Sequence, residues 1–314
     1  MLYPVFTNNR TPDICFSMRT FFIRLVLHLS ALLPLAFSHR LALAIGWLFS
    51  VIPNDMRRVT RINLQLCFPD YNAAKLRQLE HNSLTEMVKT GLELGPMWLW
   101  PQQRSMALIK NIHGQTLLDQ AITRGQGVIL AIPHIGMWEM IGLYGSSHHA
   151  MTSLYRPPRF SALDNVIRNG RERFGAKLVP TDASGIRSLY KALAKGELIA
   201  ILPDQEPRWG NGVFAPFFGL PAYTATLLPR IASKSKATIL LAYAKRLPQG
   251  RGFDLYFREV SRGCYSNDPS KAATALNQEV EQCVRELPEQ YQWNYRRFRS
   301  HPNNEQPGYY WRNK

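Results

Sequence analysis

The sequence lacks the motifs that would most directly assign a chemistry. It contains no GxGxxG or P-loop to hold a phosphate, and no GxSxG turn to present a nucleophilic serine. Internal repeats and low-complexity tracts are also absent. The 314 residues include only four cysteines, which show neither a CxxC pair nor metal-binding spacing. We therefore expect unpaired thiols in a reducing compartment at Cys15, Cys67, Cys264 and Cys283.

Acidic residues are scarce. The chain has 22 Asp and Glu against 38 Lys and Arg, which gives a net charge of +16 and a pI of about 9.9. Such an excess predicts an anionic partner, which is a nucleic acid, an anionic membrane or an acidic protein. The N-terminal segment favours the membrane among these three.

This N-terminal segment lacks a clean apolar span of about twenty residues. Residues 20–37 are strongly apolar but contain Arg24 and His28, and residues 41–53 form a second, shorter apolar stretch. No convincing signal-peptide cleavage site follows. We expect a membrane anchor here, either one tilted span or a helix lying in the interface. A buried helical hairpin of a soluble protein would give the same pattern.

The residues that follow set the predicted orientation and the domain boundary. Arg57, Arg58 and Arg61 come directly after the apolar stretches, and by the positive-inside tendency the bulk of the protein then faces the cytoplasm. We divide the chain into an N-terminal anchor with interfacial helices, residues 1–56, and a catalytic domain, residues 57–314.

Beyond residue 60 the hydrophobic pattern alternates between helix and strand periods. The predicted helices cover 73–99, 136–145, 160–175, 184–197 (capped by Ser184), 223–236 (interrupted by Pro229) and 268–286, and the predicted strands cover 128–132, 151–155, 176–180, 198–203, 212–219, 237–247 and 252–260. This alternation predicts an α/β fold, a three-layer sandwich of a mostly parallel sheet with helices on both faces.

The most informative stretch is GVILAIPHIGMWEMIGLYG, residues 127–145. Its apolar run is typical of a strand buried on both faces, so His134 follows the strand and Glu139 falls in the first turns of the next helix. Ligands bind at this edge of open α/β sheets. Across the turn, Glu139 can reach one ring nitrogen of His134 and leave the other free to accept a proton.

The spacing alone leaves other interpretations open. A hydrogen-bonded core histidine and a carboxylate at a helix N-terminus would give the same two residues. A metal site is disfavoured, because one His and one Glu are too few ligands and no third lies nearby in the sequence.

Charged residues also follow other predicted strands. Arg156 comes just past the strand at 151–155, and Arg171 and Arg173 lie near the end of the helix at 160–175. Their planar guanidinium groups suit a phosphate or a developing oxyanion. Asp204 follows the strand at 198–203 and is expected to bind hydroxyls or to order the site. Each of these side chains is also compatible with solvated surface charge or an ordinary turn.

The motif HIGMWE resembles the HxxxxD/E motif of the lysophospholipid acyltransferase superfamily. Further segments resemble the bacterial lipid A late acyltransferases (the lauroyl and myristoyl transferases) in their order along the chain, from about residue 18 to residue 302. They are RINLQLCFP, YRPP, NGRERFGAKLVP, ILPDQEP, FAPFFGLPAYTATLLPRIA and LPEQYQWNYRRFRSHP. One departure is Glu206, where members of the family often have Asp.

The resemblance implies an inner-membrane enzyme with a cytoplasmic catalytic domain and no cofactor. Its donor would be an acyl carrier protein thioester. Its acceptor would be a hydroxyl on an acyl chain of a phosphorylated, often Kdo-bearing, lipid A precursor. His134 would act as general base, oriented by Glu139, with no protein nucleophile. Arg156, Arg171, Arg173 and Asp204 would bind substrate, and Arg171, matched to the family, would stabilise the oxyanion or bind acceptor phosphate.

Three alternatives accompany this hypothesis. Another membrane lipid, such as an ornithine lipid or a glycerolipid, would serve as acceptor with the same residues. A thioesterase would use water instead. A membrane-tethered protein that binds nucleic acid or anionic lipid would explain the charge, but it would leave His134 and Glu139 without a role. We expect acyl carrier protein, the lipid A precursor and anionic inner-membrane lipid as partners, and no nucleic acid.

Overall fold

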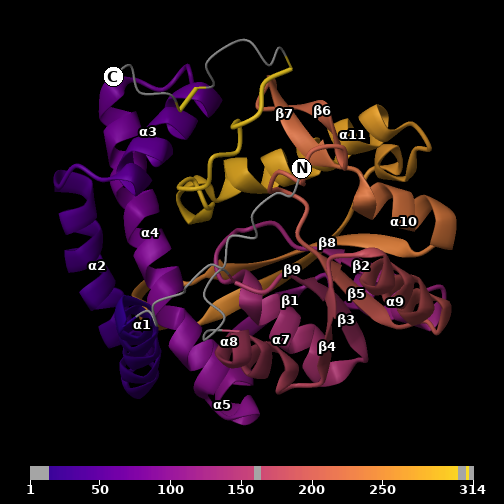
Figure 1. Ribbon diagram of the computed structural model, residues 1–314, viewed down its shortest axis with the longest axis horizontal. Coiled ribbons are helices and arrows are strands. Elements are labelled where there is room, and N and C mark those ends of the chain that lie inside the picture. Colours follow the sequence, from indigo (N-terminus) through magenta and orange to yellow (C-terminus); the bar gives the residue numbers. More distant parts are fainter. Residues whose placement is uncertain (1–13, 159–163, 303–308, 311–314) are drawn as a thin grey trace, which may run out of the picture.

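The computed structural model describes residues 14–158, 164–302 and 309–310 (Figure 1). The helices are α1 Ile14–Leu32, α2 Leu35–Val51, α3 Asp55–Cys67, α4 Ala73–Leu99, α5 Gln102–Met106, α6 Gln115–Thr123, α7 Trp138–His148, α8 Asp164–Glu172, α9 Ala183–Ala194, α10 Leu227–Ser235 and α11 Pro269–Glu286. The strands are β1 Ile109–His113, β2 Val128–Ala131, β3 Met151–Tyr155, β4 Ala176–Pro180, β5 Leu198–Ile201, β6 Gly212–Phe217, β7 Leu220–Ala225, β8 Thr238–Arg246 and β9 Phe253–Glu259.

Seven of these strands form one sheet in the order β1-β9-β8-β2-β5-β3-β4. All neighbouring pairs are parallel except β8 with β9, which form the predicted antiparallel pair. The predicted α/β fold with a mostly parallel sheet is therefore confirmed. Strands β6 and β7 form a separate antiparallel hairpin, against which α11 packs.

Two hydrophobic cores lie on opposite faces of the sheet. Along β2, Val128 and Leu130 belong to the core shared with α6 and α7, whereas Ile129 and Ala131 belong to the core shared with α9, α10 and α11. All four side chains are fully buried. Full burial of a Val, Leu or Ile side chain contributes about 1.5–3 kcal/mol. Burial on both faces explains why this strand is a continuous apolar run, and it fixes the position of the residues that follow.

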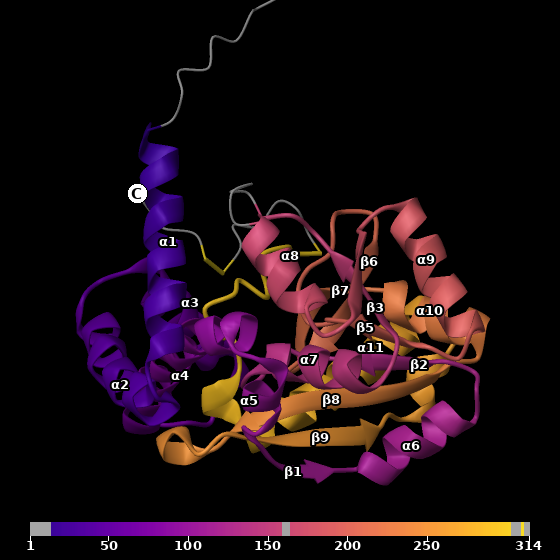
Figure 2. The ribbon, with the colours of Figure 1, turned by 90° about the horizontal axis from the view of Figure 1, so that it is seen from below.

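The N-terminal helices pack differently from those of the sheet. Both α1 and α2 lie against α4, and α1 projects beyond the rest of the molecule in Figure 2. Ser38, Ala42 and Gly46 of α2 face α4, and a Cβ at Gly46 would lie 2.4 Å from Thr85 Oγ1, so only glycine allows this close approach. The outer faces of both helices expose Met18, Phe21, Phe22, Leu25, Leu29, Leu32, Phe37, Leu41, Leu43, Trp47, Leu48 and Val51.

Among the described residues, no single helix is long and apolar enough to cross a membrane. The pair α2 and α3 has sufficient length and apolar character when taken together, but the two helices meet at an angle of 81°. The expected membrane anchor and the domain boundary at residues 56 and 57 both remain predictions.

Several local predictions need correction. The cap of α9 is Asp182, whose side chain accepts from the backbone N–H of Ser184 and Gly185, so Ser184 is not the cap. Residues 223–225 belong to strand β7, and α10 starts after them. Pro229 lies in the first turn of α10, where its missing N–H leaves no bond unmade. The prediction for 73–99 is confirmed as α4, with Asn72 as its cap.

The three cysteines whose side chains the structure describes, Cys67, Cys264 and Cys283, are buried and free, as the sequence predicts. Cys15 lies among the residues whose side chains are outside the description.

Candidate active site

The candidate site lies at the carboxyl edge of two adjacent strands, β2 and β5. Ala131 pairs with Ile201 at the end of this parallel ladder. Each strand is followed by a residue, a proline and a polar side chain, so His134 and Asp204 stand at equivalent positions three residues beyond the paired ends. The register of the sheet therefore brings together two residues that are 70 positions apart in the sequence.

His134 is held by Asp204 through two hydrogen bonds. One Asp204 oxygen lies 2.8 Å from His134 Nδ1, and the other accepts the His134 backbone N–H at 2.8 Å. Because the carboxylate only accepts hydrogen bonds, Nδ1 is the donor in this contact. The Gln205 amide nitrogen lies 3.2 Å from Nε2 and donates to it. Nδ1 of the imidazole is thus directed at Asp204, and Nε2 is directed at the Gln205 amide.

The predicted contact between Glu139 and His134 is wrong. Glu139 lies in the first turn of α7, as expected, but its carboxylate turns toward α8 and α4. Arg171 donates to both Glu139 oxygens, from Nε to Oε2 at 2.9 Å and from Nη2 to Oε1. Trp98 Nε1 also donates to Oε2, at 3.3 Å. Both nitrogens of His134 have other partners, so the group that orients the imidazole is Asp204.

Both carboxylates are ionised in the folded protein. Burial acts to raise the pKa of Glu139, but the charge and hydrogen bonds of Arg171 outweigh it, so the pKa lies below its usual value. Burial likewise acts to raise the pKa of Asp204, and the interactions with His134 outweigh it. The site therefore holds two buried negative charges, one facing a titratable ring and one facing a permanent cation.

A mostly apolar pocket adjoins the Glu139 side of the turn. Trp138, Glu139 and Arg171 line it together with Ile132, Gly142, Leu143, Met151, Ser153, Leu154, Ala176, Leu178, Ala200 and Leu202. His134 is not one of its lining residues. The Trp138 ring, however, contacts the His134 ring edge to face at a centroid distance of 4.9 Å. Trp138 thus connects the pocket with the imidazole.

The predicted arginines separate in space. Arg171 borders the pocket with about a third of its side chain exposed. Arg173 points away and donates to the backbone oxygen of Trp100, which is consistent with the two-residue spacing. Arg156 is exposed just beyond β3. Only Arg171 therefore joins Glu139 at the pocket.

Sequence reasoning missed Gln205 and Trp138, the two side chains that contact the His134 ring in addition to Asp204. Both lie inside the quoted motifs, next to Asp204 and one residue before Glu139, but neither spacing indicates a ring contact. Across the described part of the chain, no three His, Cys, Asp or Glu side chains gather closely enough to hold a metal ion.

Comparison with known proteins identifies the chain at the level of family. The model of the family described as bacterial lipid A biosynthesis acyltransferase matches residues 12–300. The chain belongs to this family. Because this family consists of lipid A biosynthesis acyltransferases, the protein is an acyltransferase of lipid A biosynthesis, and the candidate site is that of such a transferase.

Individual relatives share about a quarter of their residues with this lipid A acyltransferase. It is 27% identical to the lipid A biosynthesis lauroyltransferase of Escherichia coli strain K12, over 88% of this chain and 90% of the relative. It is 28% identical to the lipid A biosynthesis palmitoleoyltransferase of the same organism, over 78% and 79%. A lipid A biosynthesis acyltransferase of Haemophilus influenzae is 27% identical over 88% and 89%.

Proposed function

We propose that the protein transfers a fatty acyl chain from an acyl carrier protein thioester to a hydroxyl on an acyl chain of a phosphorylated lipid A precursor. One observation carries this proposal: Asp204 holds His134 through Nδ1, and Nε2 accepts from the Gln205 amide, at a strand edge beside an apolar pocket. A base next to an apolar pocket suits a hydroxyl nucleophile and a long-chain acyl donor.

In the proposed reaction, the acceptor hydroxyl displaces the Gln205 amide from His134 Nε2. The imidazole takes the hydroxyl proton while the oxygen attacks the thioester carbonyl carbon. The tetrahedral intermediate then expels the thiolate, which receives the proton from the imidazolium. Asp204 keeps the tautomer and offsets the charge of the imidazolium as it forms.

Glu139 and Arg171 have a different role in this proposal. Glu139 uses both oxygens to fix Arg171 at the wall of the pocket. The partly exposed guanidinium is then available to a developing oxyanion or to an acceptor phosphate. We also assign Arg156, which is exposed just beyond β3, to the binding of an acceptor phosphate. Arg173 donates to the Trp100 backbone, and we assign it no substrate contact.

The exposed apolar faces of α1 and α2 support membrane attachment. Side chains such as Phe21, Phe22 and Trp47 are more than half exposed, which is costly in water and favourable in a lipid interface. The net charge of +16 favours anionic lipid, the acidic carrier protein and a phosphorylated acceptor together. We therefore place the protein on the inner membrane, with its catalytic domain in the cytoplasm.

The test is a transfer assay with purified protein, labelled acyl carrier protein thioester and a lipid A precursor, with His134→Ala as control. Labelled lipid A precursor is expected from the wild type, and about 10²–10⁴-fold less from His134→Ala. Parallel reactions contain an ornithine lipid, a glycerolipid or no acceptor. Transfer only to one of those lipids would contradict the acceptor assignment. If the thioester is hydrolysed at the same rate with every acceptor, the protein is a thioesterase.

A further inference from the structure

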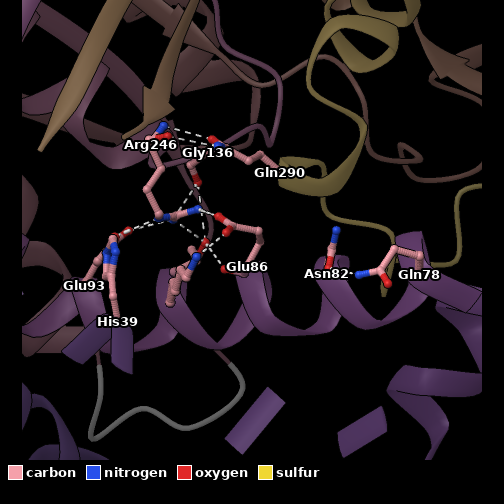
Figure 3. Close-up of polar contacts among 10 residues, drawn as sticks. His39, Gln78, Asn82, Glu86, Glu93, Gly136, Arg246 and Gln290 are labelled. Atoms are coloured by element: carbon pink, nitrogen blue, oxygen red, sulfur yellow. Dashed lines mark hydrogen bonds and ion pairs between the residues drawn. The ribbon is translucent and has the colours of Figure 1, made fainter. Parts of the chain in front are cut away.

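The turn between His134 and Glu139 is held by groups from distant parts of the chain (Figure 3). Gly136 donates its N–H to Gln290 O at 2.9 Å, and Met137 donates to Ala244 O at 3.0 Å. Gly136 has a positive φ, and a Cβ there would lie 2.0 Å from Ala244 O, so only glycine fits against β8. The backbone of the turn is thus pressed against the end of β8, where Arg246 lies.

Arg246 connects this turn to α4 through its guanidinium group. Nε and Nη2 contact the two oxygens of Glu93 at 2.7 and 2.6 Å, and Nη1 contacts Glu86 at 2.6 Å. Nη2 also lies 3.4 Å from Gly136 O and 2.8 Å from Thr90 Oγ1, which is itself 3.4 Å from Gly136 O. One side chain therefore joins two carboxylates of α4 to the turn that carries the candidate base.

The cluster extends to α2. His39 Nε2 lies 2.7 Å from Glu93 Oε1, the same oxygen that Arg246 Nε contacts. His39, Glu93 and Arg246 are each at most 3% exposed. Figure 3 shows His39 and Arg246 approaching Glu93 together. The anchor of the turn is thereby tied to a helix whose other face carries the exposed apolar side chains.

Stability alone does not account for such a cluster. Burying an ion pair costs several kcal/mol of desolvation per ion, and well-packed apolar residues of similar size often give equal or greater stability. A planar guanidinium with fixed donor directions, in contrast, defines the position of every group that it bonds. The cluster is therefore suited to setting geometry at Gly136, two residues from His134 and three from Glu139.

We propose that Arg246 is a positioning residue for acyl transfer. Held by Glu93 and Glu86, it fixes the Gly136 peptide and thereby the placement of His134 and Glu139 on either side of it. This inference rests on the proposed function for its kinetic readout, but its structural readout does not depend on turnover. Misplacement of reacting groups by about 1 Å can cost about 10²-fold in rate.

The test compares Glu93→Gln with Glu80→Gln. Glu80 is a matched control, because it is also a buried carboxylate of α4 that bonds two arginines, Arg57 and Arg61 at 2.8 Å each. We expect Glu93→Gln to lower kcat about 10- to 100-fold with KM within about two-fold, and Glu80→Gln to leave both near wild type. Hydrogen exchange at the Gly136 and Met137 amides is expected to accelerate only in Glu93→Gln, by about ten-fold or more.

A milder variant covers the case in which Glu93→Gln fails to fold. Thr90→Val keeps the volume and removes only the hydroxyl near Gly136 O, and we expect the same two changes at about a third of the size. Wild-type exchange and kcat in both folded variants would overturn the proposal, as would equal changes in Glu80→Gln. If the wild type transfers no acyl chain, the proposed function fails, and the exchange contrast alone decides the role of Arg246.

Discussion

Two side-chain pairs, each with one carboxylate, lie on either side of the same turn and differ in what they can do with a proton. His134 and Asp204 pair a titratable ring with a carboxylate, whereas Arg171 and Glu139 pair a permanent cation with one. Arginine stays charged at any pH at which the protein is folded, so the second pair cannot exchange a proton with a substrate. The first pair can, through His134 Nε2.

The HxxxxE spacing suggests that Glu139 orients the candidate base. In the structure, one carboxylate orients the base and another holds the arginine. The spacing places Glu139 near His134, but the carboxylate that contacts the imidazole comes from the segment after β5, not from α7. Glu139 instead uses its charge to hold a guanidinium at the pocket wall. Loss of Asp204 should therefore affect chemistry, and loss of Glu139 should first affect the local structure.

Of the two pairs beside this turn, the Arg171–Glu139 pair is expected to give the larger loss of stability, in Glu139→Gln. The substitution leaves the Arg171 guanidinium without its anion, and we expect a loss of about 2 kcal/mol in the free energy of unfolding. This is less than for a fully enclosed pair, because a third of Arg171 is exposed. Urea unfolding measures it. The double variant Glu139→Leu with Arg171→Met should recover most of the loss, and a double variant as unstable as the single one would contradict this account.

Acid should destabilise the folded protein through the same carboxylates. The pKa values of Glu139 and Asp204 lie below their ordinary values of 4.5 and 3.8, so the unfolded chain binds protons before the folded one. Their contribution to stability is complete above about pH 5 and is lost as the pH falls below about 4. Urea unfolding from pH 6 to 3 measures this loss. The double variant without Glu139 should lose less with acid, and an unchanged slope would assign the effect to other groups.

A smaller effect is expected at the pocket on the Glu139 side. Gly142 lines this pocket, and a Cβ there would meet only Met151, at 4.0 Å. Gly142→Leu should fill space that we assign to the acyl chain and shift preference toward shorter donors, by about four-fold per methylene. Competition between donors of different length measures the shift. Gly91→Leu, at an open position on α4, is the control, and equal preferences in both variants would place the chain elsewhere.

The sequence predicts the frame of the molecule better than the contacts of the site. Continuous apolar runs identify β2 and β5, because these strands are buried on both faces. Strand β1 has the sequence IKNIH and a largely exposed pattern, so no apolar signal marks it. The sequence also places His134 and Asp204 after buried strands, but not next to each other, because β2 neighbours β5 only through the order of the sheet. The short separation between His134 and Glu139 along the chain instead favours Glu139 as the partner of the imidazole.

The measurement that tests the central claim most directly is the single-turnover rate of acyl transfer in Asp204→Asn and Glu139→Gln, side by side at saturating substrate. Asparagine cannot hold the Nδ1–H tautomer or offset the imidazolium charge, so we expect Asp204→Asn to be slower than wild type by about 10²–10⁴-fold. Glu139→Gln should remain at least ten-fold faster than Asp204→Asn. A Glu139→Gln enzyme that is the slower of the two would show that Asp204 does not orient the base.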